Sequence, residues 1–155
     1  MQKLNQLIQE LENAIQNQEI LNPSISKSSV GWHIEHCLLV LNSVVSAVEK
    51  SNPKDYKWKF NFVRMLVMTT KKIPRGKARA PKTVQPTIDF DTESLKNHLE
   101  KSKINIQKLQ TTDSNHYFEH PYFGHLKLKP TIEFLEIHTH HHLNIIKDIV
   151  KSPKT

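Results

Sequence analysis

Four stretches of the chain repeat apolar residues at the spacing of an α-helix, and this pattern constrains the fold more than any other feature. Residues 2–17 place leucine and isoleucine three and four positions apart, with Gln, Asn and Glu between them. Similar stripes run from Ser28 or Ser29 to Val48, from Thr92 to about Gln110, and from Pro130 to just before Pro153. Only three glycines occur in 155 residues, and no internal repeat is present. We therefore expect a single all-α domain over residues 1–155, arranged as a four-helix bundle.

Two of the connections between these stretches, residues 49–91 and 111–129, have features of their own. Residues 56–62 alternate between polar and aromatic side chains, but residues 63–68 break the alternation, so we predict a short helix anchored by aromatic residues. Residues 71–82 hold six basic residues, two prolines and a glycine without apolar periodicity, which predicts a loop. Residues 111–129, which contain three histidines, are also predicted to be a loop.

The composition limits the kind of protein and the kind of metal site. No apolar run approaches the roughly 20 residues of a membrane helix, and the first residues lack a signal-peptide pattern, so we expect a cytoplasmic protein without a membrane partner. The charge of +7 raises the question of an anionic partner, but the lysines are spread widely, and we expect no nucleic-acid partner. A single cysteine, Cys37, excludes an intrachain disulfide, so any metal would be held mainly by His, Asp or Glu.

Four of the ten histidines lie within five positions of the last predicted helix. His138 and His142 are four residues apart, so they occupy one helical face, which Leu135, Ile145 and Ile149 continue. Two imidazoles at this spacing can bind one metal ion, as the paired histidines of zinc proteases do. The alternative interpretation is a solvated histidine cluster. An expression tag is not expected, because the run is internal and lies between periodic Ile and Leu.

The second predicted helix offers a third metal ligand. His36 shares the apolar face of Trp32 and Val40, and we assign it as the ligand. His33 lies only about 60° around the helix and remains the alternative. A hydrogen-bonded core histidine is the structural explanation for either residue. Three imidazoles would leave coordination positions for water or substrate, as in catalytic rather than sealed metal sites.

The same residues resemble the DinB/YfiT-like superfamily. The resemblance is carried by Trp32-x-x-x-His36 and by His138-x-x-x-His142, and it covers residues 29–150. Two further stretches, His120-Pro-Tyr-Phe-Gly124 and Lys72-Ile-Pro-Arg-Gly-Lys77, resemble a DinB-like branch of bacterial proteins. The resemblance implies an up-down-down-up four-helix bundle that binds a divalent metal, most often zinc or nickel. It implies His36, His138 and His142 as ligands. The additional His140 and His141 depart from the family pattern and leave open a register in which His141 competes for the site. Members include transferases and isomerases that use low-molecular-weight thiols.

Three functional hypotheses follow from these patterns. The first is a metal-dependent transferase or hydrolase that acts on a small molecule, with a low-molecular-weight thiol as an allowed co-reactant and a homodimer as an allowed assembly. The candidates for residues that contact the metal ligands without binding the metal themselves are Glu35, Glu136, His120 and Tyr122. The second is a non-enzymatic binding module whose basic loop, residues 71–82, binds an anionic partner. The third is a family member in which the histidines are structural. Cys37 should point about 100° away from His36, so it is not expected to be a nucleophile.

Overall fold

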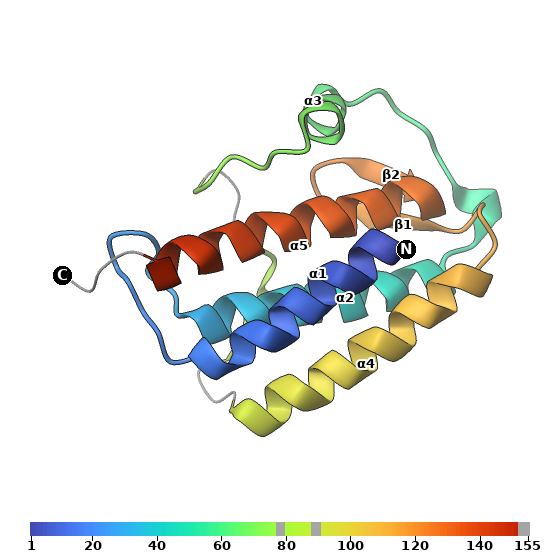
Figure 1. Ribbon diagram of the computed structural model, residues 1–155. Coiled ribbons are helices and arrows are strands. Elements are labelled where there is room, and N and C mark those ends of the chain that lie inside the picture. Colours follow the sequence, from blue (N-terminus) through green and yellow to red (C-terminus); the bar gives the residue numbers. More distant parts are fainter. Residues whose placement is uncertain (77–79, 88–90, 152–155) are drawn as a thin grey trace.

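Four long helices make up most of the computed structural model, which describes residues 1–76, 80–87 and 91–151 (Figure 1). They are α1 (Gln2–Ala14), α2 (Val30–Lys50), α4 (Thr92–Thr111) and α5 (Leu128–Lys151). The smaller elements are helix α3 (Phe62–Thr70), 3₁₀ turns at Ile15–Asn17, Pro53–Asp55 and Lys82–Val84, and the strands β1 (Tyr117–His120) and β2 (Gly124–Lys127). The protein is thus mostly helical with a small two-stranded sheet.

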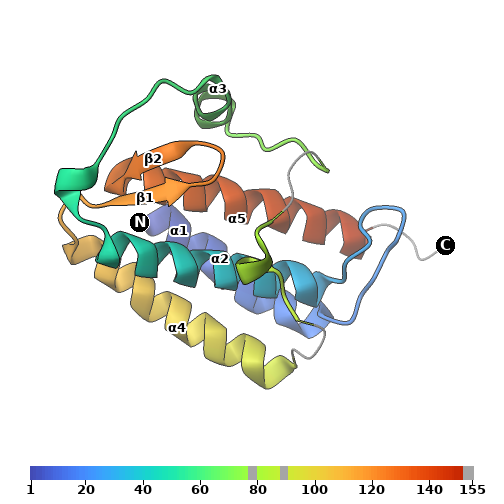
Figure 2. The ribbon, with the colours of Figure 1, turned by 180° about the vertical axis from the view of Figure 1, so that it is seen from behind.

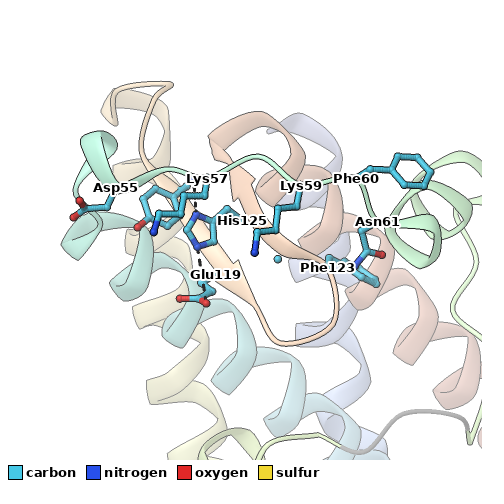
Figure 3. Close-up of a pocket in the computed structure, with 10 residues that line it drawn as sticks. Asp55, Lys57, Lys59, Phe60, Asn61, Glu119, Phe123 and His125 are labelled. Atoms are coloured by element: carbon cyan, nitrogen blue, oxygen red, sulfur yellow. Dashed lines mark hydrogen bonds and ion pairs between the residues drawn. The ribbon is translucent and has the colours of Figure 1, made fainter.

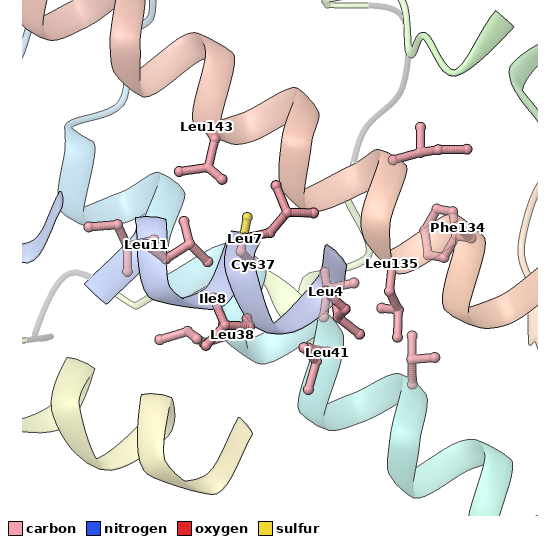
Figure 4. Close-up of a cluster of buried hydrophobic side chains, with 14 of the residues drawn as sticks. Leu4, Leu7, Ile8, Leu11, Cys37, Leu38, Leu41, Phe134, Leu135 and Leu143 are labelled. Atoms are coloured by element: carbon pink, nitrogen blue, oxygen red, sulfur yellow. The ribbon is translucent and has the colours of Figure 1, made fainter. Parts of the chain in front are cut away.

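The long helices lie side by side around one apolar core. Helix α2 packs against α4 and α5, and α1 packs against α5 and α4. In Figures 1 and 2, α2 and α4 run in one direction, whereas α1 and α5 run in the opposite direction. Figure 4 shows part of the core, in which α1, α2 and α5 contribute buried side chains that include Leu4, Leu7, Ile8, Leu11, Cys37, Leu38, Leu41, Leu135 and Leu143. These are the apolar stripes that predicted the helices, and their burial supplies most of the stabilisation.

Side-chain caps fix where two of the helices begin. The Ser29 hydroxyl accepts a hydrogen bond from the Trp32 N–H at 3.3 Å, which caps α2. Asp91 and Ser94 form a reciprocal capping box at α4, because the Asp91 carboxylate accepts from the Ser94 N–H at 2.8 Å and the Ser94 hydroxyl oxygen accepts from the Asp91 N–H at 3.0 Å. The predicted starts of these helices, at Ser28 or Ser29 and near Thr92, are therefore confirmed.

The region between α4 and α5 corrects the sequence prediction. Residues 111–129 were predicted to be a loop, but β1 and β2 form an antiparallel hairpin there, with Tyr117 opposite Lys127 and His120 opposite Gly124. Gly124 has a φ of +69°, a conformation that favours glycine at such a turn. Strands of four residues are too short for alternation to stand out in a sequence, so their pairing depends on the packing of the hairpin against α2 and α5.

The segment between α2 and α4 lies outside the four long helices. Helix α3 confirms the predicted short helix, but it begins at Phe62, and Tyr56–Asn61 belong to neither a helix nor a strand. In the predicted basic loop, residues 77–79 lie outside the described residues, and Lys82 begins a 3₁₀ turn. Arg75 forms an ion pair with Asp148 at 2.7 Å, and Lys71 pairs with Glu133, so two ion pairs join this segment to α5. Among the described helices, none is both long and apolar enough to cross a membrane.

Candidate metal centre

Three histidines from two neighbouring helices meet between α2 and α5. The ring centres of His36 and His142 are 4.8 Å apart, those of His36 and His138 are 5.1 Å apart, and those of His138 and His142 are 4.7 Å apart. One nitrogen from each ring lies within 4.8 Å of the other two. The i, i+4 spacing on α5 supplies two of the rings, and the packing of α2 against α5 supplies the third. The structure therefore brings together the three residues predicted as ligands, while metal binding itself stays a prediction.

A backbone carbonyl determines which nitrogen of His36 is available. His36 is 4% exposed, and its Nδ1 lies 2.7 Å from the carbonyl oxygen of Val84. A carbonyl only accepts hydrogen bonds, so Nδ1 carries the proton and Nε2 keeps its lone pair for a metal. The Trp32 indole stacks on the ring at 5.2 Å and restricts its rotation. In metal proteins, a hydrogen bond of this kind from the second ring nitrogen to a carbonyl commonly fixes the orientation of an imidazole that binds the metal.

A second chain of hydrogen bonds fixes His142. Its Nδ1 lies 3.0 Å from Nδ1 of His33, and Nε2 of His33 lies 3.0 Å from the hydroxyl oxygen of Ser26. If His142 donates its Nδ1–H to His33, then His33 carries its own proton on Nε2 and donates it to Ser26. The Ser26 oxygen also accepts from the Ser28 N–H at 3.1 Å, which uses its two acceptor positions. This direction leaves Nε2 of His142 free as a ligand atom. His33, the alternative ligand in the sequence, is thus in contact with His142 but outside the group of three.

Burial keeps the rings of the cluster uncharged. It lowers the pKa of His36, and it lowers the pKa of both His138 and His142 well below the usual value, with neighbouring histidines adding to the effect on His138 and His142. Burial also lowers the pKa of His33 to about 4. Neutral imidazoles are the form that binds metals, so no proton has to leave these side chains near pH 7.

The residues fit a divalent metal. Nitrogen ligands about 2.1 Å from a tetrahedral ion are separated by about 3.4 Å, so the most distant pair, within 4.8 Å in the structure, closes by at most about 1.4 Å on binding. Side-chain rotation covers such a movement. Three neutral imidazoles suit Zn²⁺ and Ni²⁺ and equally Fe²⁺ or Cu²⁺, so the ligand set does not select one metal.

His120 is placed by the hairpin beside the cluster. Its Nδ1 accepts hydrogen bonds from the backbone N–H groups of Tyr122 at 3.1 Å and Phe123 at 3.2 Å, so the neutral ring carries its proton on Nε2. The ring stacks on Phe123 at 4.1 Å and meets Phe134 edge-on at 4.6 Å, and Phe134 lies 5.7 Å from His138. Burial lowers the pKa of His120 to about 4. His120 is therefore a neutral hydrogen-bond donor next to the histidine cluster.

The other residues predicted to contact the metal ligands have different surroundings. Glu35 is buried against α4, where its carboxylate accepts from Nδ1 of His98 at 2.7 Å. Glu136 lies 3.7 Å from the N-terminal amine of Met1, and Tyr122 is 51% exposed at the hairpin turn. His141 touches the ring of His142 but is not one of the three grouped ligands. Cys37 is in the core, and burial raises the pKa of its thiol, as expected for a residue that is not a nucleophile.

Sequence reasoning missed the residues that orient the ligands. The Val84 carbonyl and the Ser26 hydroxyl belong to loop segments, and His33 was considered only as a direct ligand. A backbone carbonyl leaves no signal in a sequence, because every residue has one. The Ser26–His33 spacing of seven residues falls across a loop, where helical periodicity gives no guide.

Comparison with known proteins defines the family of the chain. A model of the family described as "protein of unknown function (DUF1569)" matches residues 1–149, so the chain belongs to the DUF1569 family. No curated protein and no solved structure matches the chain. The family description carries no activity, and a functional proposal therefore depends on the geometry of the histidine cluster.

Proposed function

We propose that this protein is a divalent-metal-binding protein of the DinB type that acts as a transferase or hydrolase on a small molecule. The single observation that carries the proposal is the convergence of His36, His138 and His142, together with the hydrogen bond from Nδ1 of His36 to the Val84 carbonyl oxygen, which leaves Nε2 of His36 free. Structural histidines in a helical core do not require three rings to meet at one point. A site of this kind is typical of metal proteins with open coordination positions.

The arrangement of the helices supports the resemblance to DinB-like proteins. Helices α2 and α4 run in one direction and α1 and α5 in the other, which is the order of an up-down-down-up four-helix bundle (Figure 1). We propose this bundle as the fold. Helices α2 and α5, which hold the histidines, are neighbours in it. Cofactor sites in bundles are built from side chains of facing helices.

The chemistry follows from the ligand set and from His120. A divalent metal held by His36, His138 and His142, with zinc and nickel as the first candidates, would lower the pKa of a water or of a low-molecular-weight thiol. Nε2–H of His120 would donate a hydrogen bond to a substrate atom close to the histidine cluster. Its lowered pKa keeps the ring neutral, so it would position a substrate rather than supply a charge.

Metal analysis tests the proposal directly. Untagged protein, purified without a metal-chelating column and reconstituted with Zn²⁺ or Ni²⁺, should hold about one ion per chain. His142→Ala should lose the ion, whereas the matched control His140→Ala should keep it, because His140 is exposed and lies outside the cluster. Circular dichroism of both variants checks that they remain folded. Absence of metal from reconstituted wild-type protein, or full metal content in His142→Ala, contradicts the proposal. Thiol-transfer and hydrolysis assays then follow on metal-loaded protein.

The binding-module hypothesis receives less support. Lys71 and Arg75, two of the four described basic residues in the loop 71–82, already pair with acidic residues of α5. Their charge is therefore partly neutralised within the chain. The segment instead lies along the helix that holds the histidine pair, and its continuation supplies the Val84 carbonyl to His36. We do not adopt it as a second function.

A further inference from the structure

An exposed apolar surface lies on the segment between α2 and α4. Six of the ten large apolar side chains that are exposed in the described part of the chain fall within residues 58–66. They are Trp58, Phe60, Phe62, Val63, Met65 and Leu66, and between 46% and 66% of each residue is exposed. We call this set the aromatic ridge. In helix α3, Val67 is buried in the core and Met68 packs against it at partial exposure, whereas the other four apolar residues of the helix are exposed. Contiguous apolar patches of this kind mark interaction sites.

Polar contacts hold the aromatic ridge in place. The Arg64 guanidinium donates to the carbonyl oxygens of Lys59 at 2.6 Å and Phe123 at 3.2 Å. The Asn61 amide donates to the Tyr122 carbonyl oxygen at 2.8 Å, and its oxygen caps α3 through the Arg64 N–H. These bonds connect the segment to the β1–β2 hairpin. The backbone that carries the exposed side chains is therefore held in a defined position. Helix α3 lies at the outer edge of the molecule in Figures 1 and 2.

Basic side chains alternate with the aromatic ones. Residues 54–66 contain four basic residues and one acidic residue. Lys57 and Lys59 line a cavity of about 630 Å³ between the segment and the hairpin, together with Asp55, Glu119 and His125. In Figure 3 the ring of Phe60 points away from His125. Both lysines are exposed, and among the described residues neither forms an ion pair, so both ammonium groups are available to an anion.

We infer that the aromatic ridge and its flanking lysines dock the protein onto an anionic lipid surface. Aromatic and aliphatic side chains beside lysines suit the boundary between lipid head groups and acyl chains, where apolar groups enter and ammonium groups meet phosphate. A second copy of the chain would bring like charges together, because the segment has an excess of basic residues. A single-stranded nucleic acid would stack on the aromatic rings but would leave Val63, Met65 and Leu66 exposed. The inference differs from the prediction of no membrane partner and is independent of the metal proposal.

Vesicle binding of the full chain tests this inference. Vesicles of phosphatidylcholine with about 30% phosphatidylglycerol should bind the protein at least about 10-fold more tightly than phosphatidylcholine alone. The double variant Phe60→Ser/Leu66→Ser should bind at least about 10-fold more weakly to anionic vesicles. Lys57→Gln/Lys59→Gln should also weaken binding and reduce its sensitivity to salt. The matched control is Ile104→Ser, because Ile104 is 57% exposed on α4, away from the ridge, and it should bind as the wild type does.

A fluorescence readout reports directly on insertion. Anionic vesicles should shift the emission of Trp58 to shorter wavelength, and Trp58→Phe should remove the shift, because the other tryptophan, Trp32, lies on α2 beside His36. Equal binding to neutral and anionic vesicles, or no binding, overturns the inference. Concentration-dependent dimerisation that Phe60→Ser/Leu66→Ser abolishes assigns the ridge to self-association and also overturns it. Tighter binding of a single-stranded oligonucleotide than of vesicles has the same consequence.

Discussion

Polar rings are buried in the histidine cluster between α2 and α5, whereas apolar side chains are exposed to water in the aromatic ridge around α3. Both regions are held by contacts from neighbouring segments. Val84, Ser26 and His33 orient the cluster, and Arg64 and Asn61 tie the ridge to the hairpin. Arrangements that cost stability persist when function requires them. The comparison teaches that one chain can bury polar rings in one region and expose apolar side chains in another, and a ligand is proposed for each region, a metal for the imidazoles and an anionic lipid surface for the ridge.

The largest effect should follow removal of a proposed ligand. His138→Ala deletes one of the three imidazoles, so metal affinity should fall by at least about 100-fold. Competition with a chromophoric chelator measures the affinity of the variant and of the wild type. Phe62→Ser serves as the comparison from the other region, and its metal affinity should be unchanged. Equal losses in the two variants would mean that the cluster and the ridge are not separate.

Acid should destabilise the metal-free protein through the cluster. The folded pKa of His33 is about 4, below the usual 6.5, so the unfolded chain binds a proton that the folded chain does not. The contribution of the neutral His33 to the free energy of unfolding is fully present above pH 6.5. It is lost as the pH falls towards 4, at about 1 kcal/mol per pH unit for one histidine. Urea unfolding at pH 7, 6 and 5 measures the slope. His33→Gln should have a shallower slope, and parallel curves would contradict the assignment.

An intermediate effect should follow loss of the partner of His142. His33→Gln keeps a polar side chain but removes the imidazole that is hydrogen-bonded to His142, so metal affinity should fall by about 10- to 100-fold. His33→Ala, which lacks any acceptor, should be weaker still. The Co²⁺-substituted protein gives a second readout, because its visible spectrum reports the ligand geometry. Wild-type affinity with an unchanged spectrum in both variants would show that His33 does not orient His142.

The smallest effect is expected for the stability of the ridge variants. Phe62 is 62% exposed, so Phe62→Ser should change the free energy of unfolding by no more than about 0.5 kcal/mol. Leu38→Ala, at a fully buried position in the core, should cost about 2–5 kcal/mol by comparison. Urea unfolding of both variants measures the difference. A loss of 2 kcal/mol or more in Phe62→Ser would mean that the ridge packs against the protein in solution.

The sequence by itself determined the long helices, the serine pair that holds the cap of α2, and the histidine pair on α5. Apolar residues at helical spacing have to be buried together, and Ser29 supplies a hydroxyl where α2 begins. An i, i+4 pair is a property of one helix, so the shared face of His138 and His142 could be predicted without the tertiary structure. These features are local, and local rules were sufficient for them.

Only the tertiary structure decided how these parts meet. The choice between His36 and His33 depended on the position of α2 beside α5, because about 60° on the helical wheel separates the two too weakly. The hairpin that places His120, and the Val84 carbonyl that orients His36, come from segments whose patterns are short or absent. The exposure of Phe60 and Phe62 could not be predicted either, because the sequence does not show whether another element covers an apolar residue. Contacts between distant segments are set by packing, and packing is a property of the whole chain.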